Sequence, residues 1–182
     1  MMKGLKEWAT VVKALENGNQ TVLLRKGGIL ETASGFKVEA KKFALFPTYE
    51  HQENASLKSQ YYGYLADARE TRPEDGYNRI TSIAEVVEER DVQSIEKIER
   101  LSQFHIWSDS YIVERMNWMP SKPMKAIFLR VFKVPQVEIP VLPDYQGCKS
   151  WIELNVNSEG EKAVLSDAEL QAQLSEFRRV LN

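Results

Sequence analysis

The alternation of hydrophobic and polar positions predicts five strands in this chain. Residues 125–134 (Lys-Ala-Ile-Phe-Leu-Arg-Val-Phe-Lys-Val) are apolar on both alternating faces, which is typical of a central strand covered on both sides. Proline cannot donate to a strand ladder, so we expect an edge strand or a loop where Pro135, Pro140 and Pro143 follow. The five predicted strands are 20–25, 43–46, 79–89, 125–134 and 149–156.

Apolar positions three to four residues apart predict a helix at each end of the chain. The first covers 4–16 and should end at Asn17-Gly18, because both residues accept the left-handed conformation that ends helices. The second begins at Ser166, which forms a capping-box pattern with Glu169. The apolar faces of the two helices are Leu5, Trp8, Val12 and Leu15, and Leu170, Leu174, Phe177 and Leu181.

The middle of the chain is less regular. Helices are predicted over 95–104 and 109–117, and a further helix after Asn54. Short strands are predicted at 29–31 and 36–39. Since neither repeats nor low-complexity segments occur, we interpret 1–182 as a single domain, with a barrel and inserted helices over 1–165 and a docking helix over 166–182.

Composition narrows the function classes. The net charge is −2, so a grip on duplex phosphates would need a local basic patch. Cys148 is the sole cysteine, which suits a reducing compartment, and we expect it to be a buried structural thiol. No apolar run is long enough to span a bilayer, so we expect a cytoplasmic protein without membrane contact, and we predict neither a cofactor nor a metal.

The order of the predicted elements resembles the PUA-like superfamily, especially its ASCH and EVE members. ASCH domains carry the motif Gly-x-Lys-x-x-Glu-x-Arg after a helix, and here Gly18 and Arg25 match it. Gln20 and Leu23 replace the Lys and Glu, so a charged pair of that family is missing. The resemblance implies an α+β fold, a PUA-like (ASCH-like) mixed β pseudobarrel with peripheral helices.

The whole chain resembles an uncharacterised bacterial family, domain of unknown function 1802. That family label implies no activity. The resemblance rests on four stretches: Leu24-Arg25-Lys26-Gly27-Gly28-Ile29, Phe46-Pro47-Thr48-Tyr49-Glu50-His51-Gln52, His105-Ile106-Trp107 and Gly147-Cys148-Lys149-Ser150-Trp151.

The segment Tyr49-Glu50-His51-Gln52 combines stacking, proton-transfer and hydrogen-bonding side chains directly after a strand and a proline. Glu50 and His51 are the candidate catalytic residues, because histidine can act as a general base near neutral pH. Neighbours on an extended chain point in opposite directions, so the two side chains need not serve one reacting atom. The alternative is a polar loop whose side chains satisfy buried backbone groups.

Two further groups are candidate ligand contacts. Arg25, Lys26 and Lys149 are cations near glycines, where a backbone can approach an anion closely. The alternative for Arg25 is an ion pair in a solvated turn. Trp107 and Trp118 could stack on a base, although a place in the core is the commoner role for such residues, and His105 is a further candidate ligand contact.

The leading hypothesis, implied by the fold resemblance, is binding of RNA or a modified base in a cleft. Tyr49, His51 and Gln52 would read the base edge, and Arg25, Lys26 and Lys149 would line the rim. A phosphodiester hydrolase that uses Glu50 and His51 is the first alternative. A protein-interaction module that uses the C-terminal helix is the second.

Overall fold

Within the described residues, seven strands form one mixed sheet in the order β2-β5-β4-β3-β1-β6, and β7 pairs with β5. The computed structural model describes residues 1–27 and 35–182, so the strand expected at 29–31 lies outside the described residues. The predicted α+β class, a mixed sheet with peripheral helices, is confirmed. The strands are β1 (Met2–Trp8), β2 (Val22–Arg25), β3 (Lys42–Thr48), β4 (Tyr77–Val92), β5 (Met124–Pro140), β6 (Trp151–Leu154) and β7 (Lys162–Ala163).

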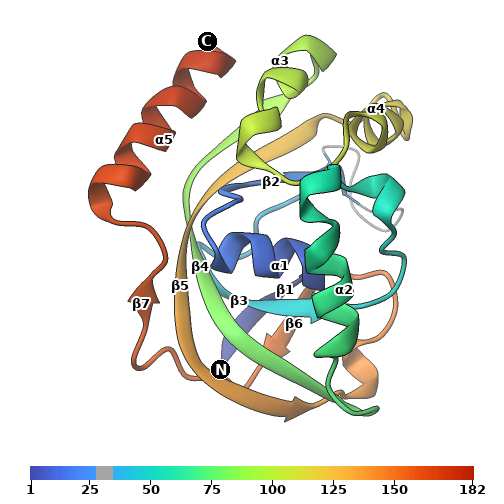
Figure 1. Ribbon diagram of the computed structural model, residues 1–182, viewed down its shortest axis with the longest axis vertical. Helices are drawn as coiled ribbons and strands as arrows, with labels where there is room; N and C mark the ends of the chain where they lie inside the picture. Colours follow the sequence, from blue (N-terminus) through green and yellow to red (C-terminus); the bar gives the residue numbers. More distant parts are fainter. Residues whose placement is uncertain (28–34) are drawn as a thin grey trace.

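The sheet curves around a central helix. The long strands β4 and β5 bend around α1, and α2 lies beside α1 (Figure 1). Register shifts after Ile80 and Val86 are bulges of the kind that bend a strand. The helices are α1 (Ala9–Glu16), α2 (Tyr62–Glu70), α3 (Ile95–Arg100), α4 (Asp109–Asn117) and α5 (Asp167–Leu181).

The barrel suggested by the number of strands is not closed. β2 and β6 are the two ends of the sheet, and within the described part of the chain no pairing joins them. Each of these strands has only four residues, so each offers few backbone groups that could pair to close the sheet into a barrel. The molecule is therefore an open, strongly curved sheet.

The predicted helix over 4–16 is wrong in its first half. Residues 2–8 form β1, and the helix begins only at Ala9. β1 pairs with β3 on one side and β6 on the other, so extended backbone satisfies its polar groups from both neighbours. A Cβ on Gly4 would lie 2.5 Å from Cδ1 of Leu154, which explains why a glycine occupies this strand position.

Other predicted elements lie close to their observed places. The strand of 125–134 continues to Pro140 and pairs there only with β4, which agrees with an edge strand. The helix predicted over 109–117 matches α4, whereas 95–104 divides into α3 and a 3-10 turn. The short strand predicted at 36–39 is wrong, because these residues form no regular element.

The C-terminal helix packs its apolar face on the core. The Phe177 ring lies 5.3 Å from the Phe128 ring of β5, and both capping-box hydrogen bonds between Ser166 and Glu169 are present. The buried positions of α5 are Leu170, Leu174, Phe177 and Val180.

No described helix has the length and apolar character needed to cross a membrane.

Candidate functional site

An open cleft of about 690 Å³ lies at one end of the sheet, a size common among ligand sites. β1 and β3 run parallel with Trp8 opposite Thr48, so both strands end at this edge. The segment that enters β4 and the segment that leaves β5 reach the same edge, because Tyr77 pairs with Pro140. The cleft is thus walled by three connections: 49–51, 72–76 and 141–148.

Aromatic side chains supply much of the cleft wall. Phe46 and Tyr145 meet edge to face, with ring centres 5.6 Å apart. Tyr77 is 50% exposed, so a large part of its surface is open to a ligand. Aromatic faces bind planar rings by stacking, whatever the identity of the ring. The aromatic lining comprises Trp8, Phe46, Tyr49, Tyr77 and Tyr145.

Lys6 places a fixed cation in the cleft. Its Nζ donates to the carbonyl oxygens of Tyr145 at 2.9 Å and Gly147 at 2.7 Å. An ammonium has three donors, so one remains for a ligand. Burial lowers the pKa of Lys6 below its ordinary value of 10.5, while the nearby Glu50 carboxylate opposes that shift.

Arg72 provides the second cation. Its guanidinium carbon lies 5.4 Å from the centre of the Tyr49 ring, within the range of a cation–π contact. Burial raises the pKa of the Tyr49 hydroxyl, which is therefore a neutral donor at physiological pH. Three carboxylates, Glu50, Glu74 and Asp75, also line the cleft, so its charges nearly balance.

The connection over 49–51 brings three of the predicted residues, Tyr49, Glu50 and His51, into the cleft wall. His51 is exposed and has a φ of 60°, in the left-handed region that non-glycine residues rarely adopt. Such a conformation costs on the order of 1–3 kcal/mol and persists only where surrounding contacts hold it.

Arg25 is not among the residues that line the cleft. It forms an ion pair, as its alternative interpretation expected, but at the half-buried end of β2 and not in a solvated turn. Its Nη1 lies 3.1 Å from Oε2 of Glu7, and its Nη2 donates to Oγ of Ser150 at 2.9 Å. Lys149 is exposed and lies next to Cys148 of the cleft wall. The expected burial of Cys148 is wrong, because its thiol is exposed on the connection after β5.

Lys26 and Gln52 are buried and do not project into the cleft. The Lys26 side chain is 1% exposed and donates to the carbonyl oxygen of Met116. Burial, and secondarily Arg115, lower the Lys26 pKa. The amide of Gln52 is bonded to Thr10 and Thr48 instead of facing a base. The expectation that these two side chains reach a ligand in the cleft is therefore not met by their positions.

His105 and Trp107 lie in the core, at 3% and 4% exposure. Their rings are 5.4 Å apart, and Nδ1 of His105 has no hydrogen-bond partner among the described residues. Burial lowers the His105 pKa from 6.5 to about 3, with Lys58 as the second cause. Trp107 therefore occupies the core position that was its commoner interpretation, and His105, a candidate ligand contact, is buried beside it.

Lys6, Arg72 and Tyr77 were not among the sequence candidates. Lys6 falls within the helix predicted over 4–16, and this error concealed its place on strand β1. Arg72 and Tyr77 border a turn rich in proline, aspartate and glycine, and turns at strand ends often carry function. Within 1–27 and 35–182, no three His, Cys, Asp or Glu side chains gather to hold a metal ion.

The family model described as "Domain of unknown function (DUF1802)" matches residues 4–176. The chain belongs to this family. The cleft of this DUF1802 chain is formed within the matched residues. No curated protein matches the sequence.

Solved structures with a similar course of the chain include crystal structures of ASCH from Zymomonas mobilis. One has a TM-score of 0.45 and 13% identity, and covers 95% of this chain and 93% of that chain. A tyrosine-to-phenylalanine mutant of the same protein has a TM-score of 0.43 and 14% identity, with 95% and 96% coverage. These values describe a distant likeness of architecture and say nothing about the ligand of the DUF1802 cleft.

Proposed function

We propose that the cleft binds single-stranded nucleic acid, RNA or a strand with a modified base, by receiving one or two unstacked bases. The observation that carries this proposal is the set of five aromatic side chains that converge on one open cleft. Bases in single strands can leave the stack and lie against aromatic rings, with about 1–3 kcal/mol gained per base.

The charges of the cleft suit a base better than a chain of phosphates. The cleft has two cations, Lys6 and Arg72, whereas a protein that binds duplex DNA or RNA contacts many phosphates. Glu50 and His51 offer acceptors and a donor for the polar edge of a base. The third donor of Lys6 suits one phosphate or one base carbonyl.

Fluorescence anisotropy tests the proposal with labelled single-stranded RNA, duplex RNA and modified single-stranded DNA at low ionic strength. We expect single strands to bind and duplex RNA to bind at least tenfold more weakly. Since the cleft has two cations, log K should fall against log salt with a slope of roughly −1.4 or shallower. No binding of any of these ligands at low salt would overturn the proposal.

The same samples test the hydrolase hypothesis, which stays a prediction. Glu50 and His51 both line the cleft, as a hydrolase would require. RNA recovered after incubation, with and without a chelator, should remain full length if the cleft only binds. Cleavage that disappears in His51→Ala would instead favour hydrolysis.

A further inference from the structure

The side chain of Gln52 closes the connection that carries Tyr49, Glu50 and His51. Its Oε1 accepts from the backbone nitrogen of Thr10 at 3.0 Å and from Oγ1 of the same residue at 2.8 Å. Its Nε2 donates to the carbonyl oxygen of Thr48 at 2.6 Å. One amide therefore joins the end of β3 to the first turn of α1.

The backbone conformation of the three residues between Thr48 and Gln52 is restrained at both ends. The Nε2 bond ties residue 52 back to residue 48, and the three residues between them line the cleft. His51 completes this turn in the left-handed region, a conformation that needs support from outside the residue. Gln52 is 8% exposed, so water does not readily compete for these bonds.

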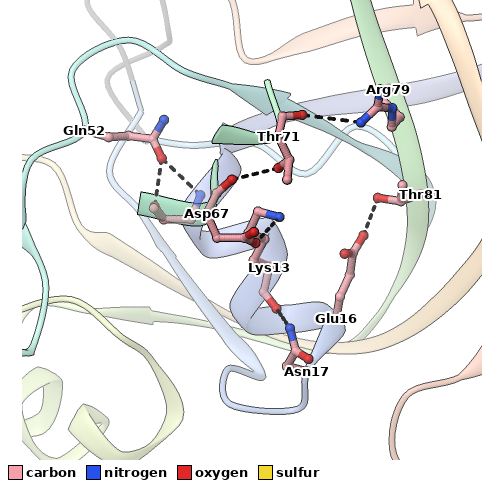
Figure 2. A network of polar contacts seen from close by, with 9 residues as sticks. Lys13, Glu16, Asn17, Gln52, Asp67, Thr71, Arg79 and Thr81 are labelled. Atoms are coloured by element: carbon pink, nitrogen blue, oxygen red, sulfur yellow. Dashed lines mark hydrogen bonds and ion pairs between the residues drawn. The ribbon is translucent and has the colours of Figure 1, made fainter. Parts of the chain in front are cut away.

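The anchor of this connection is itself fixed. Arg69 donates from Nη2 to the backbone oxygen of Gln52 at 3.4 Å, and Lys13 of α1 pairs with Asp67 of α2 at 2.5 Å. Figure 2 shows Gln52 and the Lys13–Asp67 pair beside α1, and Glu16 of the same helix accepts separately from Thr81 of β4. Gln52 thus holds the connection to a helix that is tied to α2 and the sheet.

We infer that Gln52 is a positioning residue, whose amide holds Tyr49, Glu50 and His51 in the arrangement that binds the ligand of the cleft. This inference rests on the proposed function. A glutamine suits the position because it accepts from Thr10 and donates to Thr48 at once, and neither a carboxylate nor an apolar side chain does both.

Two variants of Gln52 distinguish a loss of positioning from an effect of added charge or of lower stability. Gln52→Glu keeps an acceptor for Thr10 at the N-terminus of α1, where a carboxylate is favourable, but cannot donate to Thr48. Gln52→Met loses both bonds without adding charge. Gln60→Glu is the matched control, because Gln60 is exposed on the 3-10 turn before α2 and receives the same charge change.

The readouts are anisotropy with the single-stranded RNA used for the wild type, thermal unfolding, and the NMR signals of the His51 imidazole. We expect both Gln52 variants to lose at least tenfold in affinity at a temperature where they are folded. Gln52→Glu should lower the unfolding midpoint, because it sets a buried carboxylate oxygen against the carbonyl oxygen of Thr48, and should show broadened or multiple His51 signals at temperatures where it is still folded. Gln60→Glu should leave affinity and His51 signals as in the wild type.

The outcomes distinguish this inference from the proposed function. If the wild type binds RNA and both Gln52 variants bind within twofold of it, Gln52 is not a positioning residue. If only Gln52→Glu loses affinity, repulsion by the added charge explains the loss and the inference is overturned. If the wild type binds no RNA, the proposed function fails and the inference fails with it.

Discussion

The Arg72 guanidinium lies over the ring of Tyr49, with 5.4 Å between its central carbon and the ring centre. Arg72 is exposed, so its guanidinium is accessible to a ligand. A guanidinium is planar and stacks on bases as well as on aromatic rings. The pair therefore offers a base an extended stacking surface at the cleft wall.

Replacement of Arg72 should weaken single-strand binding. We expect Arg72→Ala to lose roughly 5- to 30-fold in affinity, which corresponds to about 1–2 kcal/mol for one stacking contact. Arg72→Lys keeps the charge without the plane and should fall between the wild type and the alanine variant. Arg100→Ala, an exposed arginine on α3, serves as the control in the anisotropy titration. Equal affinity of the lysine variant and the wild type would show that charge alone matters.

Loss of the Lys6 charge should change the salt dependence of binding. Lys6→Met keeps the length of the stem, removes the ammonium held by Tyr145 and Gly147, and should reduce the slope of log K against log salt by about 0.7. Lys133→Met removes an exposed lysine of β5 and should leave the slope unchanged. An unchanged slope in Lys6→Met would mean that Lys6 contacts no phosphate.

The sequence predicted the strands better than it predicted the site. The long apolar run in β5 has one interpretation, whereas Leu5, Trp8, Val12 and Leu15 fit a helix although the first two belong to a strand. These four residues span the junction between β1 and α1. Residues 2–8 are a strand because they pair with β3 and β6 on either side, as Gly4 does with both. Such pairings join residues far apart in the chain, so a local pattern does not reveal them.

The candidate site was predicted in part for a similar reason. Tyr49, Glu50 and His51 could be grouped from the sequence, because a loop after a strand and a proline is a local signal, and all three line the cleft. Gln52 and His105 are also polar but point inward. Thr10 donates a hydrogen bond to Gln52, and Lys58 lies near His105. Burial depends on the tertiary partner, so residue type alone could not separate these side chains from those in the cleft.

Buried His105 should make the protein sensitive to acid. Its folded pKa of about 3 lies below the ordinary 6.5, so the unfolded chain takes up the proton first. The stabilisation is complete above pH 6.5 and is lost as pH falls from 6.5 toward 3. At pH 5, His105 should lower the free energy of unfolding by about 2 kcal/mol relative to neutral pH.

Urea unfolding at pH 7 and pH 5 measures this effect. His105→Gln should shrink the difference between the two pH values by about 2 kcal/mol, because it removes the titrating group. His51→Gln is the natural control, since His51 is the other histidine of the chain and is exposed. A pH difference that persists in His105→Gln would assign the acid sensitivity to other groups.

The packing of Phe177 tests whether α5 serves the fold or a partner. The ring contacts Phe104 and Phe128, with centres 6.1 Å and 5.3 Å away, and is fully buried. Phe177→Ala should lower the free energy of unfolding by roughly 3–5 kcal/mol, as expected for a large core side chain. Arg179→Ala breaks only an exposed pair with Glu176, which water and salt screen, and should leave the free energy of unfolding nearly unchanged. A cost below 1 kcal/mol for Phe177→Ala would leave the apolar face of α5 free for a partner.

Photo-crosslinking tests the central claim, that the aromatic cleft receives unpaired bases, most directly. A single-stranded RNA that contains 4-thiouridine is irradiated with the wild-type protein, and the modified peptides are identified by mass spectrometry. Adducts are expected on the peptides that contain Tyr49, Tyr77 or Tyr145, and an excess of unlabelled single strand should remove them. Adducts concentrated on other parts of the chain, or none at RNA concentrations that saturate the anisotropy signal, would contradict the account.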